Sequence, residues 1–187
     1  MDATDSKFHA MTEGRQAQWR EIARADRAYA RDLPGRMLTH LEMLADDTHG
    51  FAIDRLQHCL QAATRALRDG RDEEFAVCAL LHDIGDVFAP RDHAEYAALV
   101  LRPFVSEKNR WMLEHHGIFQ GYYFNHFFGA DRERREQYRG HPHFEYTAEF
   151  CARYDQNCFD PHYETLTLAD CAPMLHRILS FERRRPE

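Results

Sequence analysis

The segment from Glu73 to Asp83 constrains the fold more than any other stretch of the sequence. It contains the run FAVCALLHD, which is apolar on nearly every side when it is drawn as a helix. A helix without a polar face has to be surrounded by other elements. The sequence therefore predicts a central, buried helix with other helices packed around it, and Gly85 is placed to end it.

Most of the remaining sequence has the spacing of amphipathic helices. From Ile53 to Arg68, apolar residues recur every three or four positions, and Asp69-Gly70 stops the pattern. Strand patterns are almost absent and no repeat or low-complexity linker divides the chain. We therefore expect an all-α helical bundle in a single domain over residues 1–187. Further helices are expected at 15–31 and 35–45, separated by Leu33-Pro34-Gly35, and at 92–102, 106–116, 142–157 and 166–182, the last broken near Pro173.

Charge and hydropathy argue against several classes of function. The net charge of −7 and a pI of about 6.0 disfavour a protein that binds nucleic acid through its phosphates. No apolar run approaches the roughly 20 residues that a membrane span needs. The polar N-terminus lacks the apolar stretch of a signal peptide, so we expect a cytoplasmic protein without membrane contact. Nothing in the sequence indicates an oligomeric state.

The cysteines do not indicate a site. The sequence has 5 cysteines, and no two of them form a CxxC motif. This pattern predicts neither a disulfide framework nor a thiolate zinc site. We expect these residues to be small, buried and reduced.

A histidine and an aspartate, His82 and Asp83, end the most apolar helix. An ionised carboxylate in such a place is costly unless a cation or a network of donors compensates it. One interpretation is that these two residues only cap helix ends. The other is a metal site. His58 supports it, because a short loop between neighbouring antiparallel helices would bring His58 close to His82.

Three further residues extend this candidate metal site. His93 opens the helix expected at 92–102, His116 ends the next helix, and Asp155 lies on a late one. All the candidate donors are nitrogen or oxygen atoms, a set that suits iron, manganese or zinc. His115 is the alternative to its neighbour His116.

The order of these residues resembles that of the HD-domain superfamily of helical metal enzymes. His58, the pair His82-Asp83 and Asp155 match its order H…HD…D. The two additional histidines between the pair and the last aspartate resemble its dinuclear subgroup. The resemblance covers about residues 50–165.

Two shorter motifs resemble one branch of this superfamily. They are HAEY at His93 and EHHGIFQGYYF around His116. Both are similar to the mixed-valent diiron oxygenases, which include myo-inositol oxygenase and a branch that cleaves 1-hydroxyphosphonates. The phrases LQHCLQAATRA and LLHDIGD are most similar to the phosphonate-cleaving branch.

This resemblance implies a cofactor and a role for each candidate ligand. The cofactor would be two iron ions in a mixed-valent Fe(II)/Fe(III) state, with dioxygen as co-substrate. Asp83 and His116 would lie at the reacting centre. The ligands would be His58, His82 and Asp155 for one iron and His93 and His116 for the other, with Asp83 bridging both.

The resemblance also implies an activity in phosphonate catabolism. The enzyme would cleave the C–P bond of a small hydroxyphosphonate and draw all the electrons from this substrate. The expected substrate is 1-hydroxy-2-(trimethylammonio)ethylphosphonate, which would give glycine betaine and phosphate; its free-amine analogue would give glycine. A metal-dependent phosphohydrolase is an alternative hypothesis that fits the same core residues. A non-enzymatic interaction module is the third hypothesis.

Residues near the ligands are candidates for substrate recognition. A quaternary ammonium group is held by aromatic faces and a nearby anion. Asp86, Gln120, Tyr122 and Tyr123 are therefore expected around the substrate, although such aromatics also suit a helical core and Asp86 also suits a helix cap. Arg153 is the candidate counter-charge for the phosphonate, with an interhelical ion pair as its alternative. Further aromatic candidates are Trp111, Phe119 and Phe124.

The stretch before His58 departs from the pattern of the phosphonate-cleaving branch. That branch carries a tyrosine and a glutamate there, which gate the site. This chain has DDTHGFAID, with no such pair at the same spacing. Asp46, Asp47 and His49 are the polar residues that could replace them.

Overall fold

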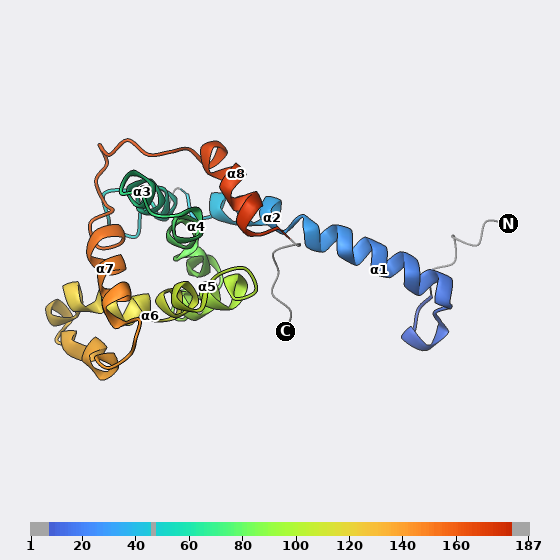
Figure 1. Ribbon diagram of the computed structural model, residues 1–187, viewed down its shortest axis with the longest axis horizontal. Coiled ribbons are helices and arrows are strands. Elements are labelled where there is room, and N and C mark those ends of the chain that lie inside the picture. Colours follow the sequence, from blue (N-terminus) through green and yellow to red (C-terminus); the bar gives the residue numbers. More distant parts are fainter. Residues whose placement is uncertain (1–7, 46–47, 181–187) are drawn as a thin grey trace.

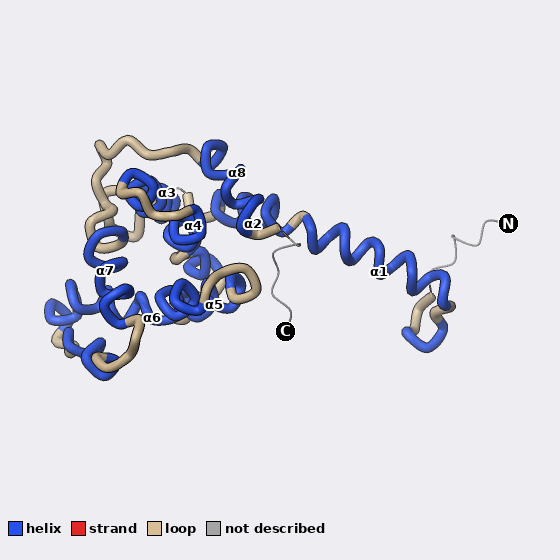
Figure 2. The backbone as a smooth tube through the Cα atoms, in the orientation of Figure 1, coloured by secondary structure: helices blue, strands red, loops and turns tan. Residues whose placement is uncertain are grey.

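The chain folds into helices joined by turns and loops. The computed structural model describes residues 8–45 and 48–180, and Figure 2 shows helices and loops but no strand in these ranges. The predicted all-α class is confirmed. The α-helices are α1 (Gln16–Arg31), α2 (Leu33–Glu42), α3 (Arg55–Arg68), α4 (Glu73–Leu81), α5 (His93–Leu101), α6 (Glu107–Phe124), α7 (Phe144–Tyr154) and α8 (Leu168–Ile178), with short 3-10 helices η1 (Met11–Glu13), η2 (Ile84–Val87), η3 (Asn125–Phe128) and η4 (Arg132–Tyr138).

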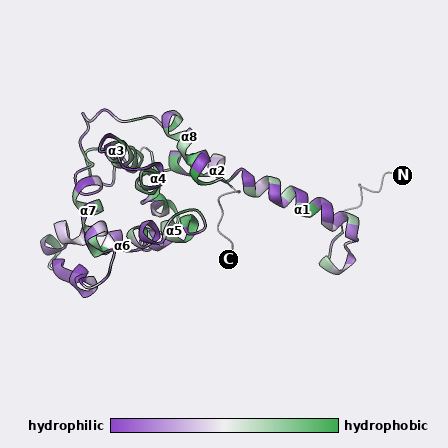
Figure 3. Ribbon diagram, viewed as in Figure 1, coloured by the Kyte–Doolittle hydropathy of each residue, from purple (hydrophilic) through white to green (hydrophobic). Residues whose placement is uncertain are grey.

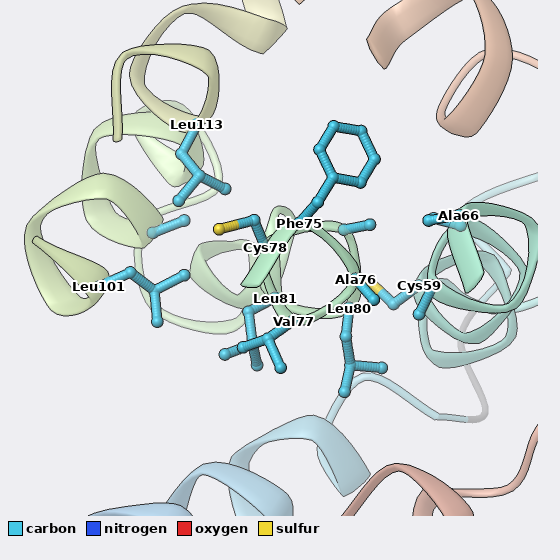
Figure 4. Close-up of a cluster of buried hydrophobic side chains, with 14 of the residues drawn as sticks. Cys59, Ala66, Phe75, Ala76, Val77, Cys78, Leu80, Leu81, Leu101 and Leu113 are labelled. Carbon is cyan, nitrogen blue, oxygen red and sulfur yellow. The ribbon is translucent and has the colours of Figure 1, made fainter. Parts of the chain in front are cut away.

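Helix α4 is the centre of the fold, as its composition predicts. Every residue from Phe75 to Leu81 is buried. Figure 4 shows Cys59 and Ala66 of α3 on one side of α4. On the other side it shows Leu101 of α5 and Leu113 of α6. Helix α8 also packs against α4 and against α2, so the apolar helix is covered by its neighbours.

The pair α3 and α4 is defined by caps and a glycine turn. The carboxylate of Asp54 accepts a hydrogen bond from the backbone N–H of Gln57 at 2.7 Å, and Asp72 accepts one from Phe75 at 2.8 Å. These caps satisfy free N–H groups at the start of each helix. Between the helices, Gly70 has φ +77°, a left-handed conformation that favours glycine. The chain therefore reverses in a short loop and α4 packs along α3.

Three helices differ from the sequence prediction. Helix α2 includes Pro34, because a proline in the first turn removes only an N–H that has no helical partner. Helix α6 does not stop near Gly117 but continues beyond Gly121, because its packing against α5, α7 and η4 outweighs the weak helix propensity of glycine. Helix α8 is continuous across Pro173, and its buried apolar face holds it in place.

Helix α1 projects away from the rest of the molecule (Figure 1). None of its residues is buried, and Figure 3 colours most of the α1 ribbon as hydrophilic. Near its start, the ring of Trp19 contacts that of Phe8 at a centroid distance of 5.2 Å. None of the helices in the described part of the chain combines the length and apolar character needed to cross a bilayer.

Candidate metal centre

Five helices bring the candidate ligands together beside the end of α4. His58 lies on α3, His116 lies on α6, and His93 is the first residue of α5. The side chains are buried, except that His93 is 25% exposed. The remaining members are His82 and Asp83, which follow α4, and Asp155, which ends α7.

One group of donors surrounds the point between His58, His82 and Asp155. The Nε2 atoms of His58 and His82 are 3.1 Å apart. The Oδ1 atom of Asp155 lies 3.4 Å from Nε2 of His58 and 3.7 Å from Nε2 of His82. Three donor atoms that converge in this way could hold one metal ion.

The carboxylate of Asp83 lies between two pairs of histidines. Its Oδ2 atom is 3.5 Å from Nε2 of His58 and 3.4 Å from Nε2 of His82. Its Oδ1 atom is 3.4 Å from Nε2 of His116 and 3.6 Å from Nε2 of His93. Because each oxygen faces a different pair, Asp83 has the placement that a carboxylate needs to bridge two ions.

Backbone carbonyls orient the histidine rings. In His58, the Nδ1 atom lies 3.1 Å from the carbonyl oxygen of Cys158. In His82, the Nδ1 atom lies 2.8 Å from the carbonyl oxygen of Ala79. In His116 it lies 2.7 Å from the carbonyl oxygen of Leu113. A carbonyl only accepts, so Nδ1 carries a proton in each ring. Nε2 therefore faces the cluster, and it offers a lone pair to a metal ion whenever the ring is neutral. Metal-binding histidines are commonly held in this way.

The cluster contains an orphaned oxygen. Oδ2 of Asp155 is buried and has no hydrogen-bond partner among the described residues. A buried carboxylate oxygen without a partner is costly. Together with the converging lone pairs, it indicates that the centre is built for positive charge, and the residues present fit metal ions.

The pKa values of the cluster show the same preference. Burial alone would raise the pKa of Asp83, but the charge of His82 and a hydrogen bond from His116 hold this pKa well below its usual value. Burial alone would lower the pKa of His82, but Asp83 and Asp155 raise it well above its usual value. The carboxylates therefore stay ionised and attract cations to the centre.

Sequence reasoning missed Arg55, which contacts the cluster directly. Its Nη1 atom lies 3.1 Å from Oδ2 of Asp83, and its Nε atom lies 2.9 Å from Oδ2 of Asp86. Asp86 in turn reaches Nδ1 of His93 with its Oδ1 atom, at 3.4 Å. The available signal was spacing, because Arg55 stands one helical turn before His58 on the same face of α3.

Sequence reasoning also missed two aromatic residues beside His58. The ring of Phe159 stacks on the imidazole of His58 at a centroid distance of 4.4 Å. Phe51 stacks on Phe159 in turn, at 4.5 Å. Phe159 therefore covers one face of the His58 ring, and Phe51 extends the stack.

The structure does not arrange Asp86, Tyr122 and Tyr123 as a binding site for a quaternary ammonium group. Asp86 is paired with Arg55, so its charge is already compensated. The ring of Tyr122 is covered by the guanidinium groups of Arg132 at 4.1 Å and Arg135 at 3.6 Å. Tyr123 is partly buried against the core. These positions agree better with structural roles than with an aromatic cage.

The other aromatic candidates and Gln120 differ in their surroundings. Trp111 and Phe119 are buried in the core, as the alternative interpretation expects, and Phe124 is 44% exposed. Gln120 does reach the cluster, because its amide Nε2 donates to Oδ1 of Asp155 at 2.8 Å. Gln120 thus holds the carboxylate that ends α7.

Arg153 does not reach the cluster. Its side chain is 52% exposed and pairs with Asp69 at 2.7 Å and Glu149 at 3.1 Å. The ion-pair alternative therefore describes its position, and the expected contact with a phosphonate at the cluster is not supported. The residue lies on a face of α7 that turns away from Asp155 because the two positions are only two residues apart on a helix.

The structure places His116, and not His115, in the cluster. The ring of His115 stacks on Trp111 at 4.1 Å, and His141 stacks on the other face of Trp111 at 4.1 Å. Nδ1 of His115 lies 2.9 Å from the carbonyl oxygen of Trp111. His115 is thereby held in an aromatic stack away from the metal centre.

A pocket of about 250 Å³ adjoins the cluster on the side of Arg55 and Asp86. Of the residues considered for gating, His49 lines this pocket with φ +49°, whereas Asp46 and Asp47 lie outside the described residues. The other lining residues are Met43, Leu44, Ala45 and Val87.

Comparison with models of protein families identifies a family. A family model described as HD domain matches residues 55–170, a range that contains the whole cluster and Arg55. No curated protein matches the chain.

Proposed function

The chain belongs to the HD-domain family, and we propose that it is a dinuclear metal enzyme that oxidises its substrate with dioxygen. Members of this family are typically metal-dependent enzymes, and the buried cluster of histidines and aspartates could hold metal ions. The observation that carries the proposal is the placement of Asp83, whose two oxygens face different histidine pairs. A carboxylate placed in this way can bridge two ions that lie side by side.

The proposed ligands divide between two ions. His58, His82 and Asp155 would hold one, and His93 and His116 would hold the other, with Asp83 between them. The carbonyl contacts at Nδ1 keep the buried imidazoles in the tautomer that binds a metal. Bound iron would supply Lewis acidity toward the substrate and electron transfer to dioxygen.

The proposed reaction is cleavage of the C–P bond of a 1-hydroxyphosphonate. One dioxygen molecule would accept four electrons as the C–H and C–P bonds of the carbinol carbon break, which yields a carboxylate and phosphate. The substrate that the sequence motifs favour is 1-hydroxy-2-(trimethylammonio)ethylphosphonate, with glycine betaine as the organic product. Burial of the cluster supports this chemistry, because it limits the access of water to the reacting atoms.

A phosphohydrolase is the second candidate, because the HD-domain match and the same cluster support it equally. Its metals would activate water for attack on a phosphate ester. The choice of the oxygenase rests on the motifs HAEY and EHHGIFQGYYF. The two candidates differ in whether dioxygen is consumed.

Anaerobic loading with ferrous iron, followed by partial oxidation, tests the proposal. We expect two irons per chain and a mixed-valent signal in electron paramagnetic resonance that changes when the hydroxyphosphonate is added. Dioxygen uptake should equal phosphate release. In Asp83→Ala the signal should vanish and the iron content should fall to one per chain or less, whereas the surface variant Asp69→Ala should behave as the wild type.

Two results would contradict the oxygenase. One is a protein that loads two metals but shows no mixed-valent signal and ignores the phosphonate. The other is metal-dependent release of phosphate from a phosphate ester without dioxygen uptake, which would establish the phosphohydrolase. Turnover that survives complete metal removal would exclude the oxygenase and the phosphohydrolase alike.

A further inference from the structure

Arg55 occupies an unusual position for an arginine. It is the first residue of α3, its side chain is only 19% exposed, and it lies between the metal centre and the pocket of about 250 Å³. Its guanidinium carbon also lies 5.5 Å from the centre of the Phe51 ring. A charge that is withdrawn from water to this extent needs anionic partners.

In the described chain, the partners of Arg55 are carboxylates of the metal centre. Nη1 pairs with Asp83 and Nε pairs with Asp86. If Asp83 shares its oxygens with metal ions, its negative charge is compensated from the other side. The guanidinium then lies beside cations with one carboxylate, Asp86, left to balance it. An additional anion near Arg55 would restore the balance.

The shape of the guanidinium allows such a second contact. The group carries five N–H donors in a planar fork. Its ion pair with Asp83 is made through Nη1 and its ion pair with Asp86 through Nε, so neither of these contacts uses Nη2. Forks of this kind bind the paired oxygens of phosphate and phosphonate groups with charge-assisted hydrogen bonds.

The adjoining pocket has room for such an anion. Arg55 and Asp86 are the ionised side chains that line it, and its other lining residues are His49 and the apolar Met43, Leu44, Ala45 and Val87. An anion that enters would be repelled by Asp86 and attracted by Arg55 and by metal ions behind it. The pocket therefore favours an anion at the end nearest Arg55.

We propose that Arg55 is a substrate-binding residue that holds a tetrahedral phosphorus oxyanion against the metal centre. This inference rests on the proposed two-metal function and names the recognition group of that site. The shared chemistry is a phosphorus centre with at least two free oxygens, either a phosphonate or a phosphate. Arg55, rather than Arg153, is then the counter-charge of the substrate.

Calorimetric titration with inorganic phosphate tests this assignment without turnover. The protein would be loaded anaerobically with ferrous iron, and the metal content of each sample would be measured. Arg55→Gln should weaken phosphate binding about 10- to 100-fold, as the loss of charge-assisted hydrogen bonds predicts, with two metals per chain retained. Arg55→Lys keeps the charge but not the fork, so it should bind with intermediate affinity. Arg153→Gln, which removes a surface arginine, should bind as the wild type.

Hydroxymethylphosphonate and methyl phosphate, titrated in parallel, identify the source of the anion. Preference for the first supports a phosphonate substrate, and preference for the second supports a phosphate ester; Arg55→Gln should weaken both. Arg55 would still be the anion-binding residue if the enzyme proves to be a hydrolase, so failure of the oxygenase is a separate result. Two outcomes overturn the inference: unchanged phosphate binding in Arg55→Gln, or loss of a metal in both Arg55 variants, which would make Arg55 a positioning residue for Asp83.

Discussion

Gly85 determines where His93 can lie. A Cβ atom at this position would be 2.5 Å from Cα of His93 and 2.7 Å from its carbonyl oxygen. Both are backbone atoms that cannot move aside without shifting the start of α5. The sequence pattern assigns Gly85 only the role of ending α4. The structure adds that the missing side chain lets η2 touch the residue proposed as a ligand.

Gly85→Ala should therefore damage the metal centre as well as the fold. We expect a loss of about 1–3 kcal/mol in the free energy of unfolding, because a methyl group is forced into a packed contact. The metal content should fall toward one ion per chain, since His93 would be displaced. Urea unfolding and metal analysis of the purified variant measure the two effects.

Gly140→Ala is the matched control for this substitution. A Cβ atom at Gly140 would meet nothing within 4 Å. Its effect should stay within about 0.5 kcal/mol, with the metal content unchanged. If both alanine variants kept two metals and full stability, the close approach at Gly85 would have no role in the site.

At the level of residues, the sequence predicts the donors better than their supports. The order of His58, His82-Asp83 and Asp155 is visible because ligands of one family recur in a fixed order. Arg55 and Phe159 carry no such signature, and their contacts arise only when α3 and the segment after α7 meet in space. Arg153 is the opposite case: it was expected near the substrate but pairs with Asp69 instead. Residues two positions apart on a helix lie on nearly opposite faces, so Arg153 points away from Asp155.

Among the elements, α7 is tied to the α3–α4 loop by Arg71. The Nε atom of Arg71 donates to Oη of Tyr154 at 3.1 Å, and its guanidinium pairs with Glu149. Tyr154 is fully buried and directly precedes Asp155. Arg71 thereby anchors the end of the helix that carries a proposed ligand.

Arg71→Gln should loosen this end of α7. We expect a loss of about 1–2 kcal/mol in the free energy of unfolding at pH 7, because hydrogen bonds of a charged donor are lost. Urea unfolding of the wild type and the variant at pH 7 and at pH 4 measures the loss. Arg153→Gln, which removes the more exposed partner of Glu149, should cost less.

The difference in free energy of unfolding between the wild type and Arg71→Gln should depend on pH because of Glu149. Burial alone would raise the pKa of Glu149, but the hydrogen bond from Arg71 lowers it below its ordinary value of 4.5. A lowered carboxyl pKa stabilises the fold above the pKa of the unfolded chain, and this contribution disappears as the pH falls through the folded pKa. The gap between wild type and Arg71→Gln should therefore narrow at low pH. A gap that widened there would contradict the assigned ion pair.

The sequence predicts the elements well where one force dominates. The apolar run of α4 and the caps Asp54 and Asp72 leave little freedom, and these helices lie where the pattern expects them. Helix α6 was predicted too short, because the weak propensity of Gly117 and Gly121 was weighed without the packing of α5 and α7 against it. Local preference fails where tertiary contact is strongest.

For the molecule as a whole, the described chain consists of a packed body and the projecting helix α1. Most of the stability of protein helices comes from tertiary packing, and α1 has no buried residue to supply it. We expect the amide hydrogens of α1 to exchange with solvent far faster than those of α4, whose residues are buried. Hydrogen exchange followed by mass spectrometry measures both. Protection of α1 equal to that of α4 would show that another surface covers it.

The two tryptophans of the sequence are divided between these two parts. Trp19 lies on α1 with the ring of Phe8 against it, whereas Trp111 lies in the packed body between the rings of His115 and His141. Their fluorescence therefore reports on separate events. In Trp19→Phe, the remaining emission would come from Trp111 and follow the packed body. In Trp111→Phe, the remaining emission would come from Trp19 and follow α1 alone. Each of the two parts therefore contains its own fluorescent reporter.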